Sequence, residues 1–212
     1  MRKTKIVCTL GPATDDEIII KELMNNGMDV VRLNMSHDTR EMQKKRIDVV
    51  KKMRNRLNKP VAILLDTKGP EIRTGVFKKP INFIPGKHIR LTTDDVIGDE
   101  TVCPINYKDL YNDIYKNCRI LINDGLIELR VKEISYTGAV CEIISGGMIS
   151  SRKGVNIPGV KLSLPFISEQ DRLDLNFAVQ EDVDFIAASF TRSADDINSM
   201  RAVLEKYGNN NF

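Results

Sequence analysis

The sequence predicts an α/β fold made of strand–helix units with an inserted all-β domain. Three observations support this class. Short apolar runs alternate with segments of helical periodicity over 1–70, period-two alternation with tight turns follows over 71–158, and the strand–helix alternation returns over 159–212. With 42% hydrophobic residues in a chain of 212, there is enough apolar material to bury a core. We therefore expect a partial β/α domain from 1–70 and 159–212, and a separate β domain from 71–158.

The first unit begins with an apolar strand over Lys5–Leu10. A helix is expected to start near Thr14 or Asp15 and to end at Gly27, because glycine readily adopts the left-handed conformation that ends helices. Its inward-facing residues are expected to be Ile18, Ile19 and Leu23.

The second and third strands are expected at Val30–Met35 and Val61–Leu65. Between them, Asp38 is a candidate N-cap with Glu41 three residues later, and the helix must end before Pro60. The third strand is almost wholly apolar, which is typical of a strand covered on both faces of its sheet.

The inserted domain contains two predicted hairpins, because tight-turn residues separate runs of β-forming residues. The runs Ile120–Ile122 and Leu126–Val131 flank Asn123-Asp124-Gly125, and the runs Val131–Ile134 and Ala139–Ile144 flank Thr137-Gly138.

After the insertion, Ser168 is expected to cap a helix that contains Leu173 and Phe177. A fourth strand over Asp184–Phe190 and a helix over Ser193–Tyr207 follow. These segments complete four β/α units, whereas a closed barrel of this kind has eight strands in about 250 residues. The chain therefore corresponds to the first four β/α units of a TIM-type barrel.

The charge balance is close to neutral, with 32 basic and 29 acidic residues giving +3. This predicts no nucleic-acid or membrane partner. The bases of the second helix could form a nucleic-acid face, but a solvent-exposed outer helix is the preferred interpretation because no recognition motif accompanies them.

No run approaches about 18 apolar residues, and Gly11-Pro12 interrupts the first apolar run, so neither a membrane span nor a secretory signal is predicted. The four cysteines form no C-x-x-C pair. We expect a cytoplasmic protein.

Polar residues on the second strand need an explanation. Arg32, Asn34 and Ser36 alternate with apolar residues and therefore share one face of the strand. If that face is buried, these groups need partners or a ligand, since unpaired burial is costly. The alternative is an exposed face, as in an antiparallel sheet.

A second polar group follows the third strand, where Asp66 and Thr67 precede Lys68, Glu71 and Arg73. Barrel enzymes place their chemistry at the carboxyl ends of their strands. Amide, hydroxyl and carboxylate oxygens suit a hard cation, and arginines suit a phosphate or carboxylate, although a basic residue near a turn is usually only solvated. The residues predict a site for a small phosphorylated acid and a metal ion.

Several segments in order resemble the pyruvate kinase family, over essentially the whole chain. They are KIVCTLGPAT at 5–14, VVRLNMSH at 30–37, ILLDTKGPEIRTG at 63–75, KGVNIPG at 153–159, LPFISEQDRLDL and FIAASFTRS. The resemblance is to the N-terminal portion: half of the β/α barrel plus an inserted β lid domain, barrel-like in form. It implies phosphoryl transfer from phosphoenolpyruvate to ADP, giving pyruvate and ATP in glycolysis.

The resemblance also implies roles for individual residues. Arg32 and Arg73 would contact phosphoenolpyruvate as catalytic residues, and His37 and Lys153 would face the nucleotide. Ser189 and Phe190 would line the site. Potassium would be held by Asn34, Ser36, Asp66 and Thr67, and Glu71 goes with potassium dependence.

Two residues depart from the family pattern. Asp38 replaces a usual glycine and adds an anion near a phosphate site, and Asn123 replaces a usual aspartate of the lid. The family's catalytic lysine and its magnesium ligands are expected beyond residue 212, so we expect residues 1–212 alone to be inactive. The alternative function is a non-catalytic half-barrel module that binds phosphate. Unpaired sheet edges also predict association, and a homo-oligomer is expected.

Overall fold

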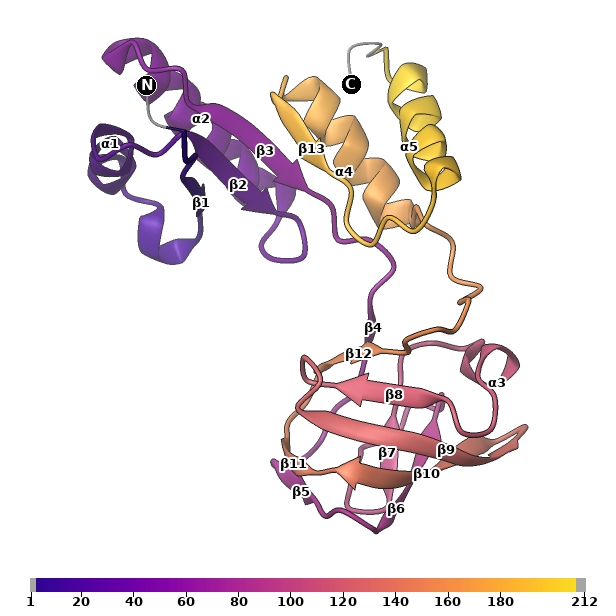
Figure 1. Cartoon of the computed structure of the whole chain (residues 1–212). Helices are drawn as coiled ribbons and strands as arrows, with labels where there is room; N and C mark the ends of the chain where they lie inside the picture. The colour runs from indigo at the N-terminus through magenta and orange to yellow at the C-terminus, as the bar shows by residue number, and fades with distance from the viewer. Residues whose placement is uncertain (1–2, 209–212) are drawn as a thin grey trace. The chain divides into compact units, whose positions relative to one another are not determined.

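The computed structural model describes residues 3–208, and its contacts divide the chain into two compact units (Figure 1). Met1–Pro70 and Pro165–Phe212 form one, called the α/β unit here, and Glu71–Leu164 form the other, the β unit. The second boundary lies at Leu164/Pro165, six residues after the expected 158/159. The reason is packing, because the apolar side chains of this connecting segment lie against the core of the β unit; they are Val160, Leu162 and Leu164.

The α/β unit contains one four-stranded sheet in the order β1-β2-β3-β13. Its strands are β1 (Val7–Thr9), β2 (Val30–Asn34), β3 (Ala62–Asp66) and β13 (Phe185–Ala187). Every pair in this sheet is parallel, which confirms the predicted strand–helix–strand pattern. The antiparallel alternative for the second strand is wrong.

The first helix buries a different set of residues from the predicted one. After the short 3-10 helix η1 (Pro12–Thr14), α1 (Glu17–Asn25) begins with Asp16 as its N-cap. Ile20 and Met24, four positions apart, share the face that is buried in the core, whereas Ile18 and Ile19 are 69% and 40% exposed. Leu23 is partly buried against the core, as predicted.

The ends of α1 and α2 show which residues stop and start the helices. Gly27 ends the α1 segment at a φ of +99°, as predicted. In α2 (Arg40–Leu57) the N-cap is Thr39, whose hydroxyl accepts the backbone N–H of Met42. The predicted cap, Asp38, lies outside the helix at a φ of +63°. Its carboxylate is bound by an arginine instead of capping the helix.

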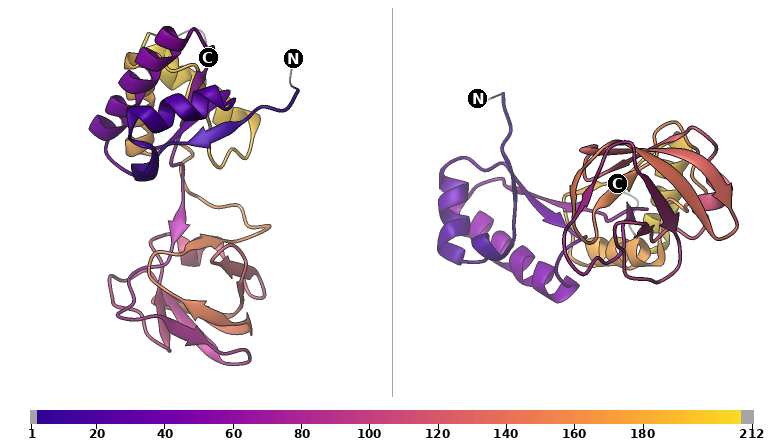
Figure 2. Two further views of the ribbon diagram at one scale, coloured as in Figure 1. Left: turned by 90° about the vertical axis from the view of Figure 1, so that its left-hand side faces the viewer. Right: turned by 90° about the horizontal axis from the view of Figure 1, so that it is seen from below.

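Helices cover one face of the parallel sheet. Side chains of β2 and β3 alternate, and their buried members pack against α1 and α2, which lie on the same side of the strands (Figure 2). The buried residues are Ile20, Met24, Val31, Leu33, Ile47, Val50, Met53, Ile63 and Leu65. On the opposite face, Arg32, Asn34 and Leu64 are only half-buried. Within residues 3–208 the third strand is therefore covered on one face, contrary to the prediction from its apolar run.

The last two helices begin at serine caps. Ser168 caps α4 (Glu169–Gln180) and Ser193 caps α5 (Ala194–Lys206), each accepting a backbone N–H with its hydroxyl. Of the two residues named in α4, Phe177 is buried and Leu173 is half exposed. The two helices share a core with the segment before α4, formed by Phe166, Ile167, Leu175, Met200, Val203 and Leu204. No helix described in the chain has the length and apolar character needed to cross a membrane.

The β unit has a core of its own, with cysteines Cys103, Cys118 and Cys141 buried in it as free thiols. Its seven-stranded sheet has the order β4-β12-β8-β9-β10-β6-β7, and β11 (Gly147–Ile149) pairs with β5 (Ile81–Phe83). The strands of the larger sheet are β4 (Ile72–Arg73), β6 (His88–Thr92), β7 (Val102–Pro104), β8 (Arg119–Ile122), β9 (Ile127–Ser135), β10 (Gly138–Ser145) and β12 (Gly154–Asn156). The β8–β9 and β9–β10 hairpins are antiparallel, as predicted. The one helix described there is short, α3 (Leu110–Asp113).

A cluster of polar side chains ties the end of the β unit to α3. The Asp113 carboxylate accepts the Ser163 backbone N–H at 2.6 Å and the Ser163 hydroxyl at 2.7 Å, and it also accepts the Tyr107 hydroxyl. Burial raises the pKa of Asp113, but the hydrogen bonds from Tyr107 and Ser163 outweigh it, so the pKa lies below 3.8. Burial and the Asp113 partner raise the pKa of Tyr107 to about 12.

We expect Asp113→Asn to lower the free energy of unfolding by about 1–2 kcal/mol at neutral pH, because one charged acceptor is lost. A carboxyl group with a depressed pKa stabilises the fold above its unfolded value of 3.8, and this stabilisation disappears as pH falls through the lower folded pKa. The difference between variant and parent should therefore persist from pH 7 to 4 and shrink below that. Urea denaturation along this pH series, with the exposed Asp95→Asn as control, measures it. An unchanged difference at the lowest pH would contradict the assignment.

Candidate functional site

The carboxyl ends of the parallel strands bring three sequence segments to one edge of the sheet. Asn34 at the end of β2 pairs in register with Asp66 at the end of β3, and Asp66 pairs with Ala187 at the end of β13. Residues that follow these strands are therefore neighbours, although up to 123 positions separate them in sequence.

Asp66 is the centre of this edge. One carboxylate oxygen accepts two N–H groups of Arg32, from Nε at 2.8 Å and from Nη2 at 2.5 Å. The other accepts the Ser189 hydroxyl at 2.7 Å. Arg32 also donates from Nη1 to the Thr9 hydroxyl at 3.0 Å. Arg32 and Asp66 thus lie on the same side of the sheet, and β1, β2, β3 and the segment after β13 all contribute to the arrangement.

In the Arg32–Asp66 pair, the arginine is the more exposed side chain and is therefore the one open to a ligand. The Asp66 side chain is 14% exposed and that of Arg32 is 34% exposed. A guanidinium held on one edge by a carboxylate keeps a fixed orientation, while its remaining N–H groups can meet an anion from solvent. The geometry therefore provides a positioned cation at the carboxyl ends of the strands.

Thr67 is buried beside this pair. Its backbone N–H and its hydroxyl both donate to the Ala187 carbonyl oxygen, at 3.1 Å and 3.3 Å, and the hydroxyl accepts the Ser189 backbone N–H at 3.2 Å. These bonds join the ends of β3 and β13, so Thr67 fixes the position of Ser189.

The segment after β2 forms a tight turn. The Asn34 side-chain oxygen accepts the backbone N–H of Ser36 at 2.9 Å, and the Asn34 carbonyl accepts that of His37 at 3.2 Å. The His37 side chain is exposed. Below the turn, Gln43 donates from its buried amide to the carbonyls of Asn34 and His37. The turn is therefore held from α2, with His37 facing solvent.

The oxygen atoms at this edge have the chemistry of a hard-cation site. The predicted ligands offer an amide oxygen, hydroxyls and one carboxylate, with no nitrogen or sulfur donor; they are Asn34, Ser36, Asp66 and Thr67. Within residues 3–208, no group of three or more His, Cys, Asp or Glu could hold a metal ion. A set with a single carboxylate fits a monovalent ion such as potassium better than a divalent one.

Arg73 and Lys153 belong to the β unit, where Arg73 ends β4 and Lys153 immediately precedes the neighbouring strand β12. Arg73 forms an ion pair with Glu71 at 2.7 Å and donates to the Arg152 carbonyl at 2.6 Å. The Thr74 backbone N–H donates to the Lys153 carbonyl oxygen at 2.8 Å, and the Lys153 backbone N–H donates to the Thr74 hydroxyl at 2.9 Å. The structure thus brings Arg73 and Lys153 close to each other. That they share a site with Arg32 or His37 stays a prediction.

Three supporting residues escaped sequence analysis: Thr9, Gln43 and Asp171. Asp171 is 1% exposed, and its carboxylate accepts the Gly69 backbone N–H at 3.0 Å while closing the capping box of α4. The Ser168-x-x-Asp171 spacing could have predicted the capping box. The bond to Gly69 spans 102 positions and leaves no local signal.

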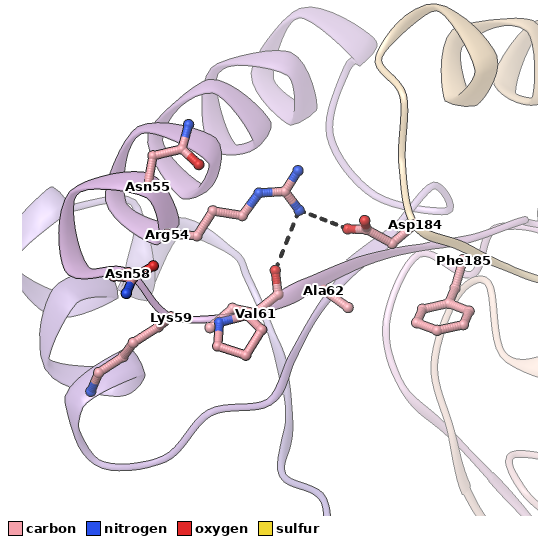
Figure 3. Close-up of a pocket in the computed structure, with 9 residues that line it drawn as sticks. Arg54, Asn55, Asn58, Lys59, Val61, Ala62, Asp184 and Phe185 are labelled. Atoms are coloured by element: carbon pink, nitrogen blue, oxygen red, sulfur yellow. Dashed lines mark hydrogen bonds and ion pairs between the residues drawn. The ribbon is translucent and has the colours of Figure 1, made fainter.

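A cavity of about 790 Å3 lies at the other end of the sheet, at the amino ends of β3 and β13 (Figure 3). Arg54 there donates to the Val61 carbonyl and pairs with Asp184 at 2.9 Å. Lys59 donates to Met24 and Asn25. Because these cations are paired and the amino ends of barrel strands serve stability more than chemistry, this cavity is not the candidate site.

Comparisons with known proteins place these residues in context. The family "Pyruvate kinase, barrel domain" matches residues 1–211. A pyruvate kinase of Staphylococcus haemolyticus is 47% identical over 215 residues, which covers 100% of this chain and 37% of that protein. Pyruvate kinases of Staphylococcus aureus and Staphylococcus epidermidis are 47% identical over 209 residues, covering 97% of the chain and 36% of each relative. The chain therefore spans little more than a third of the length of these relatives.

Proposed function

The chain belongs to the pyruvate kinase family, and from this premise we propose that it forms part of a phosphotransferase that moves a phosphoryl group from phosphoenolpyruvate to ADP. The observation that supports this most is the Arg32–Asp66–Ser189 arrangement at the carboxyl ends of the strands. In the reaction, the bond from phosphorus to the enol oxygen breaks, a bond to a terminal oxygen of ADP forms, and the enolate takes up a proton to give pyruvate.

Charge neutralisation is the main task of such a site. Phosphoenolpyruvate carries a phosphate and a carboxylate, and phosphoryl transfer depends chiefly on positioned positive charge. Arg32 supplies a guanidinium whose direction is fixed by Asp66 and Thr9. Arg73, held by Glu71 and the Arg152 carbonyl, would supply the second. Ser189 and Phe190 would line the substrate site.

Potassium is proposed to bind to Asn34, Ser36, Asp66 and Thr67, where it would add positive charge beside the substrate anion. The support is the oxygen-only chemistry of these residues. Asp66 would then serve two cations at once, Arg32 and the metal ion. The family resemblance implies magnesium as well, with ligands from later strands, and no step is assigned to it.

His37 and Lys153 are each proposed to contact the nucleotide, as the family resemblance implies. The β unit would act as a lid over it, excluding water from the reacting phosphates and bringing Lys153 and Arg73 to the site. A cytoplasmic location agrees with the glycolytic reaction proposed here.

We expect residues 1–212 alone to show no turnover above background with phosphoenolpyruvate, ADP, magnesium and potassium. The family resemblance places a catalytic lysine and the magnesium ligands on later strands, and loss of one comparable charge contact can lower a rate by about 10²- to 10³-fold. An assay coupling pyruvate formation to lactate dehydrogenase measures this. Substantial turnover would contradict the prediction and would also eliminate the alternative of a non-catalytic phosphate-binding module.

A further inference from the structure

A buried arginine joins two loops at the carboxyl ends of β1 and β2. The Arg46 side chain, from α2, is only 3% exposed. It binds both oxygens of Asp15, from Nε at 2.5 Å and from Nη2 at 3.1 Å, and it donates from Nη1 to Asp38 at 2.6 Å. Asp15 precedes α1 and Asp38 precedes α2, so one guanidinium binds the segments that lead into both helices.

The same arginine is connected to the backbone of the β2–α2 turn. Its Nη1 also donates to the Gln43 side-chain oxygen at 3.2 Å, and the Gln43 amide donates to the carbonyls of Asn34 and His37. The hydrogen bond from Arg46 lowers the pKa of Asp15, and the bond to Asp15 raises the pKa of Arg46, so the ion pair is held in its charged form. The turn that carries His37 therefore rests on Arg46 through both Asp38 and Gln43.

Asp38 is the unusual member of this network. It has a φ of +63°, a conformation that favours glycine, and glycine is the residue usual at this position in the resemblance described above. Asp38 also lines a cavity of about 310 Å3 beside α4. Without a partner, its carboxylate would have room to leave its present position, next to the exposed His37.

We propose that Arg46 is a positioning residue for the nucleotide-facing turn: it holds the Asp38 carboxylate against α2 and so keeps an anion away from the ADP phosphates. This inference rests on the proposed function in placing the nucleotide at His37. It also explains how a chain with an aspartate at a glycine position can keep a phosphate site. A lysine could not replace Arg46, because a single ammonium group lacks the planar fork that spans Asp15 and Asp38.

The test uses MgADP titrated by calorimetry into the 212-residue chain. We expect Arg46→Met to weaken binding about tenfold, because the freed Asp38 carboxylate then repels the phosphates. Adding Asp38→Gly to Arg46→Met should restore affinity to within about twofold, although the arginine is still missing. Lys45→Met, which removes an exposed charge from the neighbouring position of α2, should behave like the parent chain. Unchanged affinity in Arg46→Met, or no recovery in the double variant, would overturn the proposal.

Amide hydrogen exchange separates this proposal from the proposed function. Arg46→Met should speed exchange at residues 13–16 and 36–38 relative to Lys45→Met, whether or not nucleotide binds. If the parent chain fails to bind MgADP, the proposed nucleotide site is wrong, and the exchange result alone decides whether Arg46 positions the turn. Unchanged exchange at both segments would show that it does not.

Discussion

Replacing Asp66 with asparagine is expected to weaken phosphoenolpyruvate binding to the chain by about 10- to 100-fold. Asp66 accepts N–H groups from Arg32 and the hydroxyl of Ser189, and it is the one carboxylate among the proposed potassium ligands. An asparagine has nearly the same shape, but its amide group would turn a donor toward either Arg32 or Ser189. The variant should therefore lose the orientation of Arg32 and the attraction for the cation together.

The loss should be specific to this carboxylate. Asp182→Asn removes an exposed acid from the same unit and keeps a residue type that tolerates its positive φ of 45°. We expect it to bind phosphoenolpyruvate as the parent does. Equal affinities for Asp66→Asn and the parent would mean that the Arg32–Asp66 pair does not form the substrate site.

Replacing Gly69 with alanine is expected to lower the free energy of unfolding of the α/β unit by about 2–4 kcal/mol. Gly69 has a φ of +66°, and an added Cβ would lie 2.8 Å from a ring carbon of Phe190 and 2.9 Å from the Ser189 carbonyl oxygen. Relief of this clash would displace Ser189, whose hydroxyl binds Asp66. Chemical denaturation followed by circular dichroism measures the loss.

Gly125→Ala is the matched control for backbone strain. Gly125 has a φ of +87°, but an added Cβ would meet nothing within 4 Å. It should show only the effect of the left-handed conformation, about 1–2 kcal/mol. If the two substitutions destabilised their units equally, the close approach of Gly69 to the segment after β13 would contribute nothing to the loss of stability.

Local patterns in the sequence predicted much of the architecture. Alternation in Val30–Met35 placed Arg32 and Asn34 on one face, and in the structure both are half-buried and alternate with buried Val31 and Leu33. The turn residues between β8 and β9 predicted their hairpin, and Ser168 predicted the start of α4. Each of these features depends on residues within a few positions of one another, which is why sequence alone could predict it.

Other features depend on choices that periodicity leaves open. Thr39 and Asp38 are both good helix caps, and Arg46, eight positions beyond Asp38, binds the Asp38 carboxylate and leaves Thr39 to cap. Likewise, the run of three isoleucines at 18–20 does not show which of them faces the core, and the structure buries Ile20. The bonds from Asp66 to Arg32 and Ser189 span 34 and 123 positions, so they depend on how the strands pair. Strand pairing of this kind leaves no local trace in the sequence.

The central claim is that an anion and a monovalent cation meet at Asp66 and Arg32. The most direct test is calorimetric titration of the 212-residue chain with phosphoenolpyruvate, in potassium chloride and in tetramethylammonium chloride at the same ionic strength. We predict binding at least about tenfold tighter in potassium, since the bound ion adds positive charge next to the substrate. The same affinity in both salts would contradict the claim.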